Sequence, residues 1–270
     1  MSISTPIIYQ PFQPTLSKAG LTKYGLDYQH TKPCAVLRPY IHSYLQISTT
    51  KATPYPIAAD ATQALFFSKN GVFFGGTQYA ASELLLPEAG AYLGVHFYPG
   101  ALRHFFKVNL QEVSGTYVDV NFLGCAKLAQ LHHELFSHNS IIKRFHSLEQ
   151  NLLAQFQPLK TDVIDFCLQQ VFRFSSELRV QQLAQQAGLS SRHLNRKLTQ
   201  ATGLTSKRLL QTIKTQIAAK HFFQQTSSTA ELANQHGFYD QAHYINAFKS
   251  SFGLSPHNLR HSLMSDFSNP

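Results

Sequence analysis

The stretch Leu183-Ala184-Gln185-Gln186-Ala187-Gly188-Leu189 returns 49 residues later as Leu232-Ala233-Asn234-Gln235-His236-Gly237-Phe238. The similarity continues at an offset of 50, where Gly203-Leu204-Thr205 corresponds to Gly253-Leu254-Ser255. The second copy has therefore gained one residue in the turn after its first glycine. An internal repeat of this kind predicts one small structural unit that the chain builds twice.

Each copy has the layout of a helix-turn-helix. A short helix ends at Gly188 or Gly237, where the turn requires a left-handed backbone that glycine adopts without steric cost. An apolar residue follows and packs inward. A polar N-cap then starts a second helix, and the candidates are Ser190 or Ser191 in the first copy and Asp240 in the second. The pattern therefore predicts two helix-turn-helix units in series.

The second helix of each unit has one apolar face and one donor-rich face. Apolar residues recur at i and i+4, as Leu194 and Leu198 in the first copy and as Tyr244 and Phe248 in the second. The opposite faces carry Arg192, Asn195, Arg196 and Lys197 in one copy, and Gln241, His243, Asn246 and Lys249 in the other. Neither face has a carboxylate. A plain helical repeat with solvated faces is the simpler alternative, but two acid-free copies favour binding to DNA.

These residues resemble the DNA-binding domain of the AraC/XylS family of bacterial transcription regulators. The second copy follows the family signature from Ala233 to Arg260, and the first copy fits it from Leu183 to Gly203. The resemblance implies an all-α DNA-binding domain over residues 159–262, with a helix near 205–223 joining the two units and a C-terminal tail at 263–270. The resemblance also implies activation of transcription as one of the expected activities.

Carried over position by position, the resemblance implies separate roles for the exposed side chains. The residues expected to read bases in two successive major grooves are Arg192, Asn195, Arg196, Gln241, Ala242, His243 and Asn246. The residues expected to contact phosphates are Lys197, Lys207, Lys249 and Arg260. The family often has arginine at position 246, so whether Asn246 keeps a DNA contact stays open.

The first 125 residues have the pattern of short strands and turns. Apolar runs on both sides of Asn70-Gly71 predict a hairpin, and residues 91–98 form an aromatic run that ends at Pro99-Gly100. Two helical pieces are expected to interrupt the strands, at Leu37–Leu45 and Ala101–Phe106. The spacing becomes helical over about 125–157. The predicted fold class is therefore α+β and multidomain, with a β-rich domain at residues 1–158 ahead of the helical one.

The N-terminal half more loosely resembles a sensor or dimerisation domain found ahead of such DNA-binding units. The residues that carry this resemblance lie at 37–44 and 94–101. It implies a β-rich sensor for a small molecule and helices at 125–157 that pair two protomers. The aromatic side chains Phe66, Phe73, Phe97 and Tyr98 are candidates for an apolar effector pocket, although alternating aromatics in strands are more often plain core.

Composition restricts the class of protein. The 23 basic and 14 acidic side chains leave a net charge of +9, and residues 160–270 carry 12 basic against 6 acidic residues, which suits an anionic partner. No apolar run is long enough to span a membrane, and Met1–Pro6 lacks the features of a secretory leader. Three widely spaced cysteines fit neither a disulfide framework nor a metal knuckle. A cytoplasmic, nucleoid-associated protein is expected.

The scattered histidines and carboxylates form no recognisable metal-binding or catalytic motif, so no enzyme activity, metal or cofactor is expected. We therefore expect a sequence-specific transcription regulator. Its expected partners are promoter DNA and also a small-molecule effector, RNA polymerase and a second copy of the chain. An adaptor that uses its basic helices on an acidic protein is the alternative. The sequence leaves open the target promoter, the effector, and whether binding activates or represses.

Overall fold

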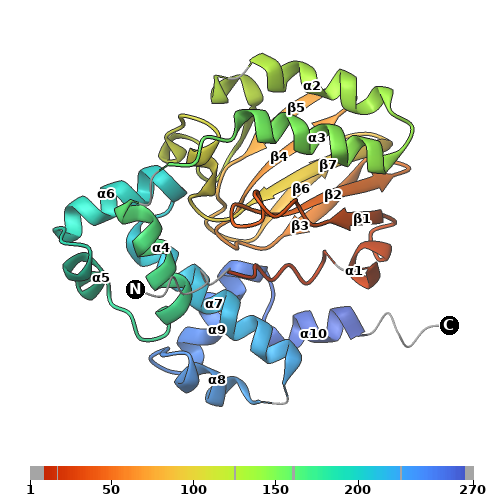
Figure 1. The fold of residues 1–270 in the computed structure, drawn as a ribbon. Helices are drawn as coiled ribbons and strands as arrows, with labels where there is room; N and C mark the ends of the chain where they lie inside the picture. Colours follow the sequence, from red (N-terminus) through yellow and green to blue (C-terminus); the bar gives the residue numbers. More distant parts are fainter. Residues whose placement is uncertain (1–8, 17, 125, 160–161, 226, 265–270) are drawn as a thin grey trace.

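The computed structural model describes residues 9–264 except residues 17, 125, 160–161 and 226. The N-terminal residues 1–8, residue 125 of the expected pairing segment, and residues 265–270 of the expected tail lie outside the described residues. A β-rich part precedes a helical part, so the predicted fold class is confirmed (Figure 1).

The β-rich part is built on a six-stranded antiparallel sheet in the order β1-β2-β7-β4-β5-β8, and β3 pairs with β6 in a second, two-stranded sheet. A short helix, α1 (Lys18–Thr22), precedes the strands. The strands are β1 (Asp27–Thr31), β2 (Ile41–Thr49), β3 (Thr53–Ile57), β4 (Gln63–Ser68), β5 (Gly71–Gly75), β6 (Ser82–Leu86), β7 (Gly90–Phe97) and β8 (Tyr117–Asp119). Short 3-10 helices lie between β7 and β8, at Ala101–His104 and Leu110–Glu112, and after β8, at Val120–Leu123.

The sheet has two differently covered faces because side chains alternate along each strand. On one face Leu65, Phe67 and Phe74 pack under the helices α2 (Ala126–Ser137) and α3 (Ile141–Gln155), which lie across the sheet in Figure 1. On the other face Leu45 and Ile47 belong to a cluster with residues of β3 and β6. The predicted Asn-Gly hairpin is confirmed as β4–β5, and the aromatic run 91–98 forms β7 and the residue that follows it.

The helix expected at Leu37–Leu45 does not form. Residues 35–40 make turns, and β2 begins at Ile41. Tyr44 pairs with Val95 and Ile47 with Tyr92 of the neighbouring strand β7. Pairing with a distant strand therefore outweighs the local three- and four-residue spacing that favoured a helix.

The helical part consists of α4 (Val163–Phe174), α5 (Val180–Gln186), α6 (Ser191–Thr202), α7 (Ser206–Gln224), α8 (Thr229–Gln235), α9 (Gln241–Phe252) and α10 (Pro256–Met264). Asp162 caps α4, since its carboxylate accepts hydrogen bonds from the backbone of Ile164 and Asp165. The helix expected near 205–223 is confirmed as α7. It lies between α5–α6 on one side and α8–α10 on the other (Figure 1).

The hydrophobic core crosses the junction between the two parts. The cluster under α2 and α3 continues through Leu102 and Leu168 to Leu194 and Leu198 of α6. The α8–α9 unit instead has a separate aromatic cluster, which includes Phe222, Tyr244 and Phe248. The first helix-turn-helix unit is therefore packed into the same core as the β-rich part.

Candidate nucleic-acid interface

The two units have the same local geometry. Gly188 and Gly237 lie in left-handed conformations with φ of 65° and 66°. Ser190 caps α6 by accepting from the backbone of His193 at 3.2 Å, and Asp240 caps α9 by accepting from the backbone of His243 at 2.7 Å. The predicted helix-turn-helix layout is therefore confirmed in both copies, with Ser190 rather than Ser191 as the first cap.

The outward face of α6 presents two free guanidinium groups. Arg192 and Arg196 are exposed, and among the described residues neither has a hydrogen-bond or ion-pair partner. Leu194 and Leu198 on the inward face are fully buried. Both arginines are thus held on a rigid helix with their donors directed to solvent.

Asn195 has a structural contact that sequence reasoning did not foresee. This half-buried side chain accepts a hydrogen bond at its Oδ1 from the backbone N–H of Ser206 at 2.9 Å. It thereby fixes the start of α7 against α6. Its base-reading role stays a prediction, and only the amide nitrogen has no protein partner among the described residues.

The outward face of α9 is more occupied by contacts within the protein. Gln241 donates to Thr229 Oγ1 at 2.6 Å. The His243 ring lies edge-on to Phe238 and accepts at Nδ1 from the backbone N–H of Tyr239 at 3.3 Å. Ala242 and Asn246 are exposed. The two predicted reading faces are therefore unequal in free donors.

The four predicted phosphate contacts also differ in their surroundings. Lys207 and Lys249 are exposed, on the first turn of α7 and the last turn of α9, and Lys197 is half-buried. The Arg260 guanidinium lies 3.7 Å from the centre of the Phe222 ring and donates to the Phe222 carbonyl. Arg260 therefore stabilises the packing of α10 on α7, and its phosphate contact stays a prediction.

The second helices of the two units, α6 and α9 (the recognition helices), both end against the β-rich part, a contact that the sequence did not reveal. Thr77 Oγ1 donates to the Thr202 carbonyl at 2.6 Å, and Ser114 Oγ donates to the Gly203 carbonyl at 2.7 Å. At the end of α9, the backbone N–H groups of Ala59 and Ala81 donate to the carbonyls of Ser251 and Ser250, both at 2.8 Å. The last carbonyls of a helix have no partner inside it, so donors from the β-rich part satisfy them here.

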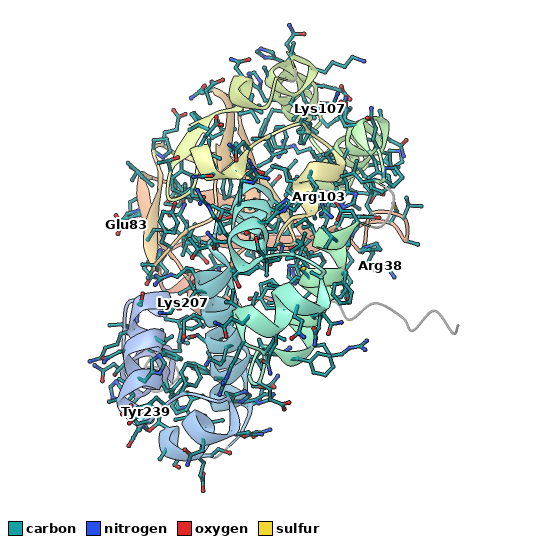
Figure 2. All side chains as sticks on the ribbon, turned by 90° about the vertical axis from the view of Figure 1, so that its left-hand side faces the viewer. Arg38, Glu83, Arg103, Lys107, Lys207 and Tyr239 are labelled. Carbon is teal, nitrogen blue, oxygen red and sulfur yellow. The ribbon has the colours of Figure 1, made fainter. Side chains whose placement is uncertain are left out.

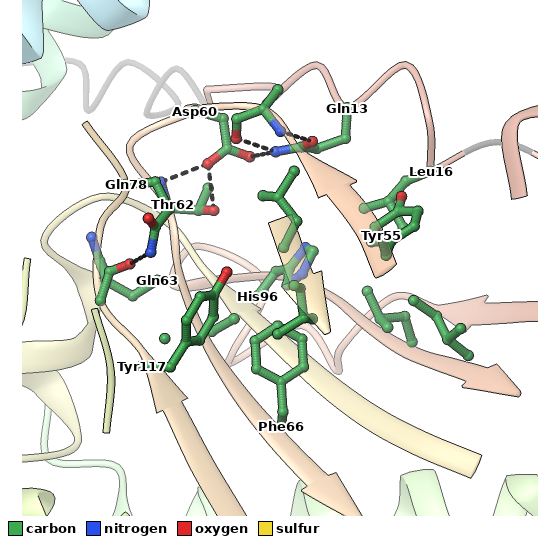
Figure 3. A pocket seen from close by; sticks show the side chains of 18 residues that line it. Gln13, Leu16, Tyr55, Asp60, Thr62, Gln63, Phe66, Gln78, His96 and Tyr117 are labelled. Carbon is green, nitrogen blue, oxygen red and sulfur yellow. Dashed lines mark hydrogen bonds between the residues drawn. The ribbon is translucent and has the colours of Figure 1, made fainter. Parts of the chain in front are cut away.

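A pocket of about 580 Å³, including its mouth, lies between the large sheet and the β3–β6 sheet. Figure 3 shows Asp60, Gln63 and Gln78 at one end and Phe66 at the other. Among the described residues, the buried Oε1 atom of Gln63 has no hydrogen-bond partner. Burial raises the pKa of Asp60, against hydrogen bonds from Thr62 and Gln13 that lower it, and burial lowers the pKa of His96 to about 4. The pocket thus combines apolar walls with a polar end that contains Asp60.

The structure does not bring the four predicted pocket aromatics together. Phe66 lines this pocket, whereas Phe97 is fully buried on the opposite face of the sheet. Phe73 is 47% exposed, and Tyr98 lines a different pocket, at the junction with α4. Neighbouring strand residues face opposite sides, and no alternation in sequence tells which side encloses a cavity.

Two further features concern only the part of the chain that the structure describes. No group of three histidine, cysteine or acidic side chains is arranged there to hold a metal ion. None of its helices is both long enough and apolar enough to cross a membrane.

Two family models match the chain. Residues 183–262 match a helix-turn-helix domain, and residues 29–119 match a domain of unknown function, DUF6597. The first match covers both units and the helix between them. The match agrees with the resemblance of this part to the AraC/XylS regulators.

Among curated proteins, the chain is similar to the HTH-type transcriptional activator RhaS of Salmonella arizonae and of Salmonella newport. Each is 36% identical over 88 residues, which are 32% of this chain and 31% of that protein. The chain thus spans about a third of the length of the curated relatives it matches.

Among solved structures, the chain is similar to the C-terminal domain of AraT from Geobacillus stearothermophilus, with 26% identity, coverage of 38% of this chain and 86% of that one, and a TM-score of 0.36. The DNA-binding domain of AdpA, solved with a target DNA, is 21% identical, with coverage of 41% and 100% and a TM-score of 0.37. ToxT from Vibrio cholerae is 12% identical over 87% of this chain and 97% of its own, with a TM-score of 0.44.

Proposed function

We propose that this chain, whose C-terminal part carries a helix-turn-helix domain of the AraC/XylS type, is a sequence-specific DNA-binding regulator of transcription. In this proposal α6 and α9 enter two successive major grooves of promoter DNA, about one helical turn apart. The protein then acts in the cytoplasm, at the nucleoid, with RNA polymerase and a second copy of the chain as further partners.

The observation that carries the proposal is the free, acid-free face of α6. Arg192 and Arg196 are exposed on one rigid helix, and no carboxylate of that helix neutralises them. A guanidinium suits the O6 and N7 acceptors of guanine in the major groove. An adaptor for an acidic protein needs the positive charge but does not need a rigid, repeated helix-turn-helix.

The contacts between the two parts support a response to an effector. Gln63 lines the pocket and donates to Thr77 Oγ1 at 2.5 Å, and Thr77 in turn donates to the last turn of α6. Ala59 lies beside the pocket residue Asp60 and contacts the end of α9. A ligand that moves this wall would therefore change the orientation of both recognition helices.

The pocket suits a small effector with an apolar body. Phe66, Leu45 and Leu84 provide its apolar walls. Asp60 accepts hydrogen bonds from Gln13 at 2.7 Å and from Thr62 at 2.6 Å, which fix its carboxyl group at the polar end of the pocket.

The test of DNA binding is a selection of duplexes from a randomised library with the full chain, followed by titration of the selected and a random duplex at several salt concentrations. We expect one enriched sequence family, a preference of orders of magnitude over the random duplex, and a steep fall of affinity with salt. The double variant Arg192→Ala/Arg196→Ala should lose the preference.

The matched control is Arg38→Ala/Lys107→Ala, which removes the same charge from the β-rich part. Both side chains are exposed, and Figure 2 shows them away from the second unit. This control should keep the preference. Equal losses in the two double variants, or no enriched sequence, would favour the adaptor.

A further inference from the structure

The turn of the second unit has one residue more than the turn of the first. In the first unit Leu189 is followed directly by the cap Ser190, whereas in the second unit Tyr239 stands between Phe238 and the cap Asp240. Tyr239 is 91% exposed, the highest value among the exposed large hydrophobic residues of the described chain. The inserted residue is therefore an aromatic side chain turned to solvent.

This exposure is built into a well-fixed turn. Phe238 is buried, and Lys214 donates to the carbonyl of Gly237 at 2.9 Å with its ammonium group 4.6 Å from the centre of the Phe238 ring. The backbone N–H of Tyr239 donates to His243 Nδ1. The two neighbours of Tyr239, the buried Phe238 and the N-cap Asp240, are thus fixed in place, and the side chain of Tyr239 lies in solvent.

The position of Tyr239 is the one from which a recognition helix meets DNA. It immediately precedes the N-cap of α9, and the N-terminal residues of a recognition helix lie closest to the bases. Figure 2 shows Tyr239 at the end of the molecule away from Lys107 of the β-rich part. No described residue contacts its ring or its hydroxyl in a ring pair or hydrogen bond.

Two of the predicted base-reading side chains of α9 also make contacts inside the protein, which makes this position more important. Gln241 and His243 each make one contact inside the protein, whereas the Asn246 side chain has no protein partner among the described residues. Tyrosine hydroxyls are among the groups that contact phosphate oxygens in protein–DNA complexes.

We propose that Tyr239 is a DNA-contacting residue, whose hydroxyl donates to a phosphate oxygen beside the major groove entered by α9. The inference rests on the proposed function and deepens it. It makes the second unit mainly an anchor on the DNA backbone, while the arginines of α6 read sequence.

The experiment compares Tyr239→Phe and Tyr239→Ala with the parent chain, using the selected duplex and a random duplex. Tyr239→Phe removes only the hydroxyl and should weaken binding to both duplexes by about tenfold. Tyr239→Ala should weaken it at least as much. Because the phenol is neutral, the slope of log K against log salt should stay unchanged, unlike the slope on removal of a lysine.

Tyr79→Ala serves as the control, since Tyr79 is a 47% exposed tyrosine of the β-rich part. It should leave both affinities unchanged. Unchanged binding of both Tyr239 variants to both duplexes overturns the inference, and so does a loss of transcription with polymerase while DNA affinity stays intact. If the parent chain itself binds neither duplex, the proposed function fails instead.

Discussion

The first and second helix-turn-helix units differ far more in their surroundings than in their backbones. Their recognition helices both have 12 residues and end at glycines with φ of 78° and 80°. The first unit shares the core of the β-rich part, while the second has an aromatic cluster of its own. A sequence repeat therefore preserves local geometry, but the neighbours of each copy decide which side chains stay free.

The β-rich part holds the two helix ends by different donors. It caps α6 with the side-chain hydroxyls of Thr77 and Ser114, and α9 with backbone N–H groups. Hydroxyl contacts depend on side-chain identity, whereas backbone contacts survive substitution at the same position. We therefore expect substitutions to loosen the first unit more easily than the second.

The largest difference between the two units is expected in the free energy of unfolding of two glycine variants. An alanine Cβ at position 203 would overlap Ser114 Oγ and lie 3.2 Å from the Leu110 carbonyl oxygen, whereas at position 253 its nearest contact is Ala81 Cβ at 3.5 Å. Both glycines have positive φ, which costs alanine about 1–2 kcal/mol. Gly203→Ala should lower the free energy of unfolding by about a further 1–3 kcal/mol, because the added methyl group overpacks this site.

Urea denaturation of Gly203→Ala and Gly253→Ala, followed by circular dichroism, measures this difference in the free energy of unfolding. The shared positive φ cancels between the two variants, so the excess loss at position 203 reports the packing against the β-rich part. Equal losses would show that the first unit is no more tightly docked than the second.

A smaller difference, in the affinity for the selected duplex, is expected between substitutions at corresponding positions of the two reading faces. Arg196→Ala should weaken binding to the selected duplex by about 1–3 kcal/mol and relax the preference at one base pair. Asn246→Ala should cost less, because its amide is neutral. Repeating the duplex selection with each variant measures both effects, and an unchanged preference for Arg196→Ala would refute its major-groove contact.

The smallest effect is expected from Lys249→Ala. Loss of one exposed ammonium group should lower the affinity for all duplexes alike and reduce the salt slope by about one unit. Titration of the selected and the random duplex between low and physiological salt tests this. A loss confined to the selected duplex would instead place Lys249 among the base-reading residues.

The helical part was largely predictable because its signals are local. The turn glycines, the caps Asp162, Ser190 and Asp240, and the inward residues of α6 and α9 all act within a few positions of one another. The β-rich part was less predictable. The stretch at 37–45 has helical spacing, yet its pairing with β7 made most of it a strand.

The candidate sites were predictable only in part for the same reason. Exposure of Arg192 and Arg196 follows from helical spacing, but the contact of Asn195 with Ser206 joins residues of two different helices. The pocket likewise forms where two sheets meet, so Phe66 lines it and Phe97 does not.

The sequence by itself determined the two units, their caps and turns, and the acid-free faces of α6 and α9, because each depends on residues three or four positions apart. Only the tertiary structure decided how those units sit on the β-rich part, which donors remain free, and where the pocket lies. Hydrogen bonds such as that of Thr77 to Thr202 join residues 125 positions apart, and no local pattern encodes such a partner.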